Sequence, residues 1–253
     1  TNKKNKRYSQ SYLATIQTPK LHNMDVSGLS QKQIASQLTA LQSQLSIFKG
    51  PLWTVAYLTG YSDNSARLFF AFHHLIIDTV SWRIIKDDLQ SLTQGKTLGK
   101  KTSSYRQWVN TVKHYANTHQ DQITYWQEQL SGLPNYLAHQ KVDHVDMELK
   151  LDASLTDQLL RQAGDAYHTQ VNDLLLTALA YALKDALGGT THGISLEGHG
   201  REPIDDTINV GNTLGWFTTI FPVKLNLKDA IGESIKSIKE QLRAIPDKGL
   251  GFS

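Results

Sequence analysis

The chain has 253 residues, of which 40% are hydrophobic and 19% charged, a composition typical of a folded globular protein rather than a disordered or fibrous one. Its 26 basic and 23 acidic residues give a net charge of +3, too small to indicate a nucleic-acid partner, and its lack of cysteine excludes disulfides, thiolate metal sites and a cysteine nucleophile. No apolar run approaches the roughly 20 residues of a membrane span and no signal peptide is present, so we predict a cytoplasmic protein without a membrane partner.

Helices and strands alternate along residues 1–134. Apolar residues spaced three or four apart predict helices, and short apolar runs between turn-forming residues predict strands. The predicted elements are a helix over 31–48, strands over 52–59 and 66–74, a helix capped by Asp78 or Thr79, and a helix over 105–130 interrupted around 117–121. The strand at 66–74 is apolar on both faces, which is typical of a strand in the middle of a covered sheet.

A second series of alternating elements follows the helix stop at 131–134. Its predicted elements are a strand over 145–151, helices over 155–166 and 171–187, a short strand over 193–196, a strand over 217–227 and a helix from Asp229. Because strands and helices alternate in both halves, the sequence predicts an α/β fold. We predict an N-terminal lobe at 1–134, a linker at 135–144 and a C-terminal lobe at 145–253.

Two adjacent histidines, His73 and His74, end the most apolar run of the chain and precede Asp78. Neighbouring residues of a strand point to opposite faces, so one ring would face a core and the other a cleft, and the two would not share a metal ion. A pair of hydrogen-bonded core histidines is an equal alternative. Asp78 is interpreted as a helix cap in preference to a catalytic acid, and with Arg83 or Arg201 nearby it could also form a buried ion pair.

Two glycine-rich strings lie beside predicted strands, one after the strand at 193–196 and one before the strand at 217–227. LEGHGREP, at 196–203, places a carboxylate, a histidine and an arginine around two glycines, which permit unusual backbone angles and the close approach of a ligand. A solvated turn of mixed charge is the alternative. In GNTLGWFT, at 211–218, we interpret Trp216 and Phe217 as core side chains. HExxH, GxSxG, P-loop and GxGxxG motifs are absent, so zinc-hydrolase, serine-hydrolase and nucleotide-binding functions lack support.

Taken in order, five strings resemble the core motifs of epimerization domains of nonribosomal peptide synthetases, members of the condensation-domain superfamily. The strings are HHLIIDTVSWRI, NDLLLTAL, EGHGRE, NTLGWFTTIFPV and PDKGLGFS. The resemblance implies a chloramphenicol-acetyltransferase-like fold of two lobes that face a cleft. The first and last motifs of the family are missing, so we expect a chain truncated at both ends, with an incomplete second lobe.

The resemblance also implies an activity: epimerization, from L to D, at the α-carbon of an aminoacyl or peptidyl thioester. A peptidyl carrier protein would deliver this substrate on its phosphopantetheine arm, and no cofactor would be bound directly. His74 and Glu197 correspond to the family's two acid/base groups. Inversion of a carbon needs a proton removed on one face and returned on the other, which two such groups can do without a metal. The predicted supporting residues are His73, Asp78, Arg83 and Arg201.

The thioester enolate would need hydrogen-bond donors near its oxygen. His199, Arg201 or the backbone N–H groups at Gly198 are candidates, and the sequence does not choose between them; Trp216 is a candidate substrate contact. Two alternative functions remain. An amide-forming condensation domain is disfavoured by EGHGRE and by SWR after the histidine signature. An inactive carrier-docking remnant stays open because Thr79 stands where the family signature has glycine.

Overall fold

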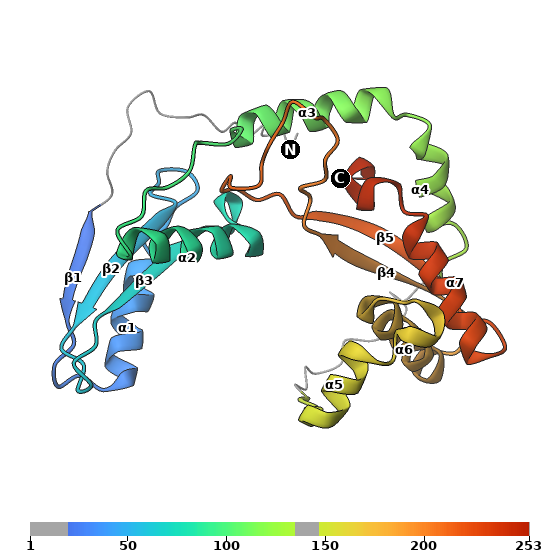
Figure 1. The fold of residues 1–253 in the computed structure, drawn as a ribbon, viewed down its shortest axis with the longest axis horizontal. Helices are drawn as coiled ribbons and strands as arrows, with labels where there is room; N and C mark the ends of the chain where they lie inside the picture. Colours follow the sequence, from blue (N-terminus) through green and yellow to red (C-terminus); the bar gives the residue numbers. More distant parts are fainter. Residues whose placement is uncertain (1–19, 135–146, 253) are drawn as a thin grey trace, which may run out of the picture. The chain divides into compact units, whose positions relative to one another are not determined.

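The computed structural model describes residues 20–134 and 147–252, and the chain forms two compact units that divide between Ile77 and Asp78 (Figure 1). Both units combine helices with strands, so the predicted α/β fold is confirmed. The linker predicted at 135–144 lies outside the described residues. The division into lobes at 1–134 and 145–253 stays a prediction.

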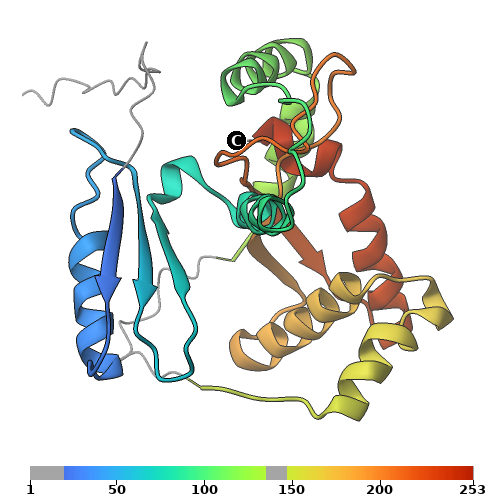
Figure 2. The ribbon, with the colours of Figure 1, turned by 60° about the vertical axis from the view of Figure 1, so that its left-hand side comes forward.

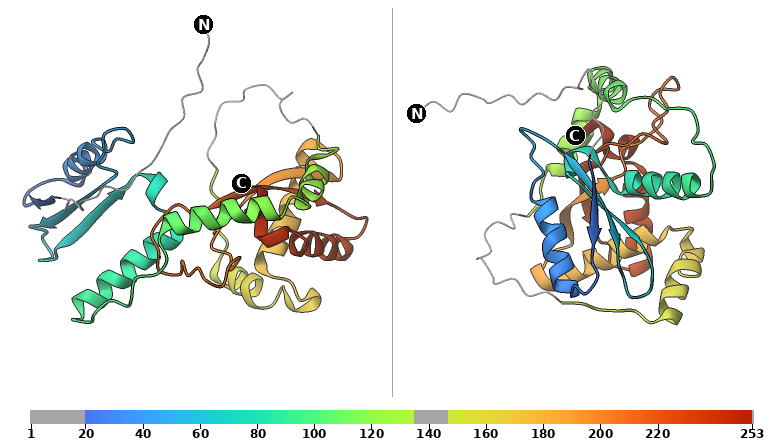
Figure 3. Two further views of the ribbon diagram at one scale, coloured as in Figure 1. Left: turned by 90° about the horizontal axis from the view of Figure 1, so that it is seen from above. Right: turned by 90° about the vertical axis from the view of Figure 1, so that its left-hand side faces the viewer.

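The first unit is a βαβ arrangement extended by a hairpin. Its elements are β1 Leu21–Asp25, α1 Gln31–Gln42, β2 Trp53–Thr59 and β3 Arg67–Phe72. β2 pairs with β1 in parallel and with β3 antiparallel. Parallel strands need a crossover connection, and α1 forms the one between β1 and β2. Ile34 and Leu38 of α1 pack over Ala56 and Leu58 on one face of the sheet (Figures 2 and 3).

Three predictions for the first unit need correction. β1 was not predicted, because its sequence LHNMD is too polar to stand out. The helix predicted over 31–48 ends at Gln42, since the chain must reverse before β2; Gly50 N–H donates to Ser46 O to close that turn. The predicted hairpin forms, but β3 is an edge strand of the described sheet and β2 is its middle strand.

The second unit is built on an antiparallel pair of strands covered by helices. Its elements are α2 Thr79–Thr93, α3 Tyr105–Thr118, α4 Gln122–Leu130, α5 Ala153–Arg161, α6 Val171–Leu187, β4 Thr191–Gly198, β5 Thr219–Asn226 and α7 Ile231–Arg243. Alternate residues Phe221, Val223 and Leu225 of β5 face one core, where Ala180 of α6 and Ile238 of α7 pack against them (Figure 2). The opposite face of β4 is therefore turned away from this core.

Local patterns predicted most of the second unit correctly, including the break between α3 and α4. Three boundaries differ from the prediction. Of the strand predicted over 145–151, the described residues 147–151 form no strand, and Met147 is 92% exposed. The strand predicted over 193–196 is longer: β4 pairs with β5 as far as Gly198, so Glu197 lies on a strand and not in a turn. The helix predicted from 155 to 166 ends at Arg161.

A segment with an irregular backbone, Pro246–Phe252, packs against α3, α4 and the ends of β4 and β5, near the C mark of Figures 1 and 3. Asp247 and Lys248 have positive φ angles of 38° and 48°. The buried Tyr115 hydroxyl donates to the Asp247 carboxylate and accepts from Gln122 Nε2 at 2.6 Å. Burial, reinforced by the hydrogen bond to Asp247, raises the pKa of Tyr115 from its ordinary value of 10.0 to about 12.

This raised pKa predicts a loss of stability in alkali. The folded state holds the phenolic proton more tightly than the unfolded state, so the contribution is complete below about pH 10 and is lost as the pH rises towards 12. Tyr115→Phe should lower the free energy of unfolding at neutral pH, and the gap to the wild type should close above pH 10. Urea unfolding across this range measures the gap. A gap that widened with pH would contradict the assignment.

Candidate functional site

The two histidines lie just past the end of β3, so the premise that they are neighbours on a strand is wrong. His73 N–H donates to Leu52 O at 2.7 Å, and its ring Nδ1 accepts from Leu75 N–H at 3.2 Å, which caps the short 3₁₀ helix His74–Ile76. Because Nδ1 is an acceptor, the proton of the neutral His73 ring is on Nε2. His73 is half-buried and oriented by this cap, whereas His74 is exposed on the first residue of the helix.

Asp78 caps α2 and lies at the centre of a buried hydrogen-bond network. Its Oδ1 accepts from Ser81 N–H at 2.7 Å, and its Oδ2 accepts from Phe217 N–H at 3.2 Å. Both carboxylate oxygens accept from Arg201 Nη2 at 3.1 Å. The predicted cap and ion pair therefore both form. Arg201 is the partner, and Arg83 is exposed on α2.

The Arg201 guanidinium connects α2 to two loops of the same unit. Its Nη1 donates to Val210 O at 2.8 Å and to Thr213 O at 2.7 Å, and the group stacks 3.8 Å over the Phe217 ring. The Arg201 side chain is 7% exposed and that of Asp78 3%. Burial lowers the pKa of Arg201, and the charge of Asp78 opposes this shift. Because its guanidinium is buried and already bonded within the unit, Arg201 has a structural role and does not donate to a substrate.

Ser81 completes this network and was missed by the sequence reasoning. The side chain is fully buried; its Oγ donates to Gly215 O and accepts from Gly215 N–H, both at 3.1 Å, and also accepts from Arg201 Nη2 at 3.1 Å. The available signal was a serine in the first turn of an amphipathic helix, three residues after the N-cap aspartate. We call Asp78, Ser81 and Arg201 the buried anchor.

Glu197 is the next-to-last residue of β4 and is exposed. Leu196 packs on the core, so the alternation of the strand turns Glu197 to the other face, opposite Ile220 of β5. Among residues 20–134 and 147–252, none forms an ion pair or a side-chain hydrogen bond with its carboxylate. Glu197 is therefore an exposed carboxylate near the end of a strand, with no such partner in the described ranges.

The turn after Glu197 is packed too tightly for side chains at its glycines. A Cβ on Gly198 would lie 2.7 Å from Thr219 Oγ1, and one on Gly200, at φ +64°, would lie 1.7 Å from Phe217 O. Between them, His199 Nδ1 accepts from Arg201 N–H at 3.0 Å, and Nε2 lies 3.1 Å from Glu202 Oε1. Both ring nitrogens of His199, a predicted substrate or enolate contact, are thus engaged within the turn.

The close approach at Gly200 gives a stability prediction. Gly200→Ala should destabilise the chain by more than the roughly 1–2 kcal/mol of left-handed strain alone, because backbone must move to admit the methyl group. Gly95→Ala is the matched control, since Gly95 has a φ of +72° with no atom near its Cβ position. Chemical denaturation of both variants measures the difference. Equal losses would show that Gly200 is required only for its φ angle.

Trp216 is held at the surface between two buried residues. Gly215 is bound to Ser81, and Phe217 is buried against Tyr105 with ring centroids 5.0 Å apart. Tyr105 O–H donates to Trp216 O at 2.7 Å, while the indole is 37% exposed. The interpretation of Phe217 as core is confirmed and that of Trp216 as core is wrong. Its role as a substrate contact stays a prediction.

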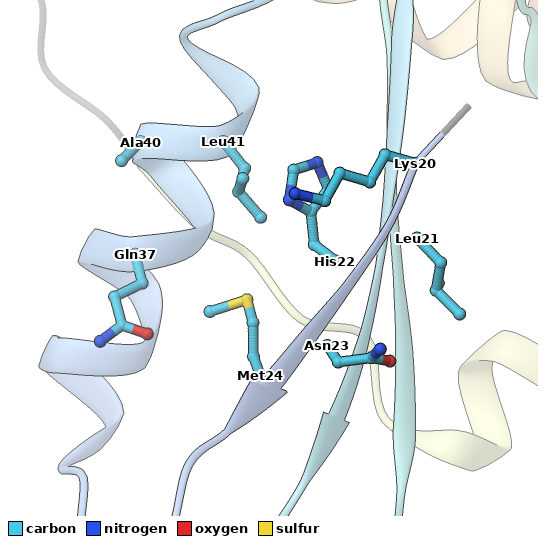
Figure 4. A pocket seen from close by; sticks show the side chains of 8 residues that line it. All are labelled: Lys20, Leu21, His22, Asn23, Met24, Gln37, Ala40 and Leu41. Carbon is cyan, nitrogen blue, oxygen red and sulfur yellow. The ribbon is translucent and has the colours of Figure 1, made fainter.

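A hollow of about 520 Å³ lies in the first unit between β1 and α1. Figure 4 shows His22 and Met24 projecting towards Leu41 of α1, with Lys20 at the rim. None of the predicted site residues lines this hollow. Within the described ranges, no group of three metal-ligating residues was found, and no helix there is long and apolar enough to cross a membrane.

Comparison with known proteins gives matches along the whole chain. A family model described as the condensation domain matches residues 1–253. N-(5-amino-5-carboxypentanoyl)-L-cysteinyl-D-valine synthase of Amycolatopsis lactamdurans is 36% identical over 236 residues, which cover 92% of this chain and 6% of that protein. Bacitracin synthase 1 of Bacillus licheniformis is 37% identical over 246 residues, covering 90% of this chain and 5% of that protein. The chain spans only a small part of these relatives.

A solved structure shares the fold. The epimerization domain from the third module of tyrocidine synthetase B is 33% identical with a TM-score of 0.79, and the alignment covers 92% of this chain and 57% of that one. The predicted chloramphenicol-acetyltransferase-like fold is confirmed by this similarity, for the part of the fold that the chain spans.

Proposed function

The chain belongs to the condensation-domain family of nonribosomal peptide synthetases, and from this premise we propose that it epimerizes the α-carbon of an aminoacyl or peptidyl thioester. The main support for this proposal is the contrast between the two glutamates of EGHGRE. Glu202 is buried and forms ion pairs with His199 and Lys248, whereas Glu197 is exposed at the end of β4 with no ion-pair partner in the described ranges. One glutamate is thus structural, and the other is available as an acid/base group.

Two similarities support epimerization over amide formation. The tyrocidine synthetase B domain of similar fold is itself described as an epimerization domain. The name of the Amycolatopsis relative specifies a D-valine residue in its product. A D-residue in a peptide requires an inversion step or a supply of the D-amino acid, and an epimerization domain provides the first.

The proposed reaction needs two proton carriers and no change of oxidation state. One of His74 and Glu197 takes the α-proton, and the electrons of the broken C–H bond move into the thioester carbonyl to give an enolate. The other group returns a proton to the opposite face, which restores the carbonyl with inverted configuration. Both side chains are exposed; Glu197 lies near the end of β4, and His74 begins the 3₁₀ helix that follows β3.

Enolate stabilisation would come from groups other than the Arg201 side chain. That guanidinium is buried and bonded to Asp78, Ser81 and two carbonyls. Backbone N–H groups of the turn at Gly198 are the candidate donors that stay in the proposal. The substrate would arrive on the phosphopantetheine arm of a peptidyl carrier protein, which is the proposed partner.

The reaction type can be tested by loading an aminoacyl group onto a carrier protein or a pantetheine mimic and incubating it with the chain in D₂O. The proposal predicts deuterium at the α-carbon together with a mixture of L and D configurations. Amide product after addition of a second loaded carrier, without α-deuterium, would instead support an amide-forming condensation domain. Carrier binding without either reaction would support an inactive docking module.

A further inference from the structure

The second glutamate of EGHGRE, Glu202, connects two segments that lie beside Glu197. Its side chain is 10% exposed; Oε1 lies 3.1 Å from His199 Nε2, and Oε2 lies 3.5 Å from Lys248 Nζ. A carboxylate buried to this degree needs such partners to offset the loss of water. The sequence alone indicated no role for Glu202.

The contact with His199 fixes the backbone of the turn. Because Nδ1 accepts a hydrogen bond, the hydrogen of the neutral ring lies on Nε2, which faces Glu202 Oε1 at 3.1 Å. Nδ1 accepts from Arg201 N–H at 3.0 Å. The carboxylate therefore orients the ring, and the ring holds the backbone between Gly198 and Arg201, directly after Glu197.

The contact with Lys248 reaches the irregular segment Pro246–Phe252. Lys248 O would lie 3.2 Å from a Cβ on Gly198, and a Cβ on Gly249 would lie 1.9 Å from Phe221 Cδ1 of β5. This segment therefore packs directly on the ends of the two strands. Glu202 links it to the turn, and the buried anchor holds the same turn separately through Arg201.

We propose that Glu202 is a positioning residue for Glu197: it holds the end of β4 by its ion-pair contacts with His199 on one side and Lys248 on the other. The effect on catalysis rests on the proposed function. The effect of Glu202 on the order of the neighbouring backbone does not. If Glu202 is lost, both the 198–201 backbone and the 247–250 backbone become more mobile, and the Glu197 carboxylate loses its fixed position.

The test compares Glu202→Ala and Glu202→Gln with Glu233→Gln, which alters an exposed glutamate on α7 paired with Lys236. Glu202→Gln keeps an oxygen that can accept from His199 Nε2, so it should rescue most of what alanine loses. Amide hydrogen exchange should rise at 198–201 and 247–250 in Glu202→Ala and stay near wild type in the other two variants. Unchanged exchange in Glu202→Ala would overturn the inference, whether or not the chain is active.

The catalytic consequence is measured on a pantetheine thioester as kcat and KM for α-deuterium uptake. Glu202→Ala should lower kcat about 10- to 100-fold with little change in KM, because the binding surface stays and the proton carrier is misplaced. Glu202→Gln should recover most of kcat. Full kcat in Glu202→Ala would overturn the inference while leaving the proposed function intact. No uptake by the wild type would overturn the proposed function, and hydrogen exchange would still decide the role of Glu202.

Discussion

Glu197→Gln and His74→Ala are each expected to lower the rate of inversion at the α-carbon by roughly 10²- to 10⁴-fold, the usual contribution of a general acid or base. Glutamine keeps the size of Glu197 on the strand end but accepts no proton, and alanine removes the ring of His74. Both side chains are exposed, so their loss should leave the free energy of unfolding near that of the wild type. Rates are measured from the L/D ratio of the recovered thioester.

The two variants should also differ in which configuration of the substrate still exchanges its α-proton, a difference that a one-base reaction would not give. If each group serves one face, each variant still removes the α-proton of one configuration and fails with the other. Separate incubations of L- and D-thioesters in D₂O would therefore show uptake into opposite configurations. Glu240→Gln and His114→Ala, which change exposed residues outside the site, are the matched controls. Equal loss of uptake from both configurations in either variant would contradict the two-base assignment.

Arg201→Ala is expected to lower the free energy of unfolding by about 3–5 kcal/mol, the cost of removing one partner from a buried ion pair. The substitution leaves the Asp78 carboxylate buried without its cation and removes the Arg201 donor from the carbonyls of Val210 and Thr213. Urea unfolding monitored by tryptophan fluorescence measures the loss.

An exposed ion pair provides the control for Arg201. Arg243 is 52% exposed and lies 3.3 Å from Glu240, so Arg243→Ala should change the free energy of unfolding by no more than about 1 kcal/mol. A double-mutant cycle with Asp78→Asn separates the ion pair from the other contacts of Arg201. Losses of similar size in Arg201→Ala and Arg243→Ala would contradict the description of Asp78, Ser81 and Arg201 as a buried anchor.

The elements that were predicted correctly are those whose ends carry a capping residue or a helix-breaking segment in the sequence. The aspartate before α2 and the interruption between α3 and α4 are of this kind, because capping and helix breaks depend on neighbouring residues. β1 and the early end of α1 depend instead on pairing with β2, which is distant in the chain. β4 was predicted too short because its glycines at 193 and 198 weaken the strand pattern, although pairing with β5 continues through them.

The candidate site was predicted as a set of residues rather than as an arrangement. The partner of Asp78 could not be chosen between Arg83 and Arg201, since Arg201 is 123 positions away and only the fold brings it close. Similarly, the string EGHGRE does not reveal which glutamate is buried. In the structure, strand alternation turns Glu197 to the exposed face of β4, whereas Glu202 is buried and forms ion pairs with His199 and Lys248. Ser81 was missed because a buried serine in a first turn resembles an ordinary helix residue.

The most direct test of epimerization starts from the pure L-thioester and, separately, from the pure D-thioester, with the wild-type chain in D₂O. We expect both incubations to converge on one L/D ratio and both recovered epimers to carry deuterium at the α-carbon. Retention of each starting configuration without deuterium, by a folded chain that binds the carrier, would contradict the proposed function.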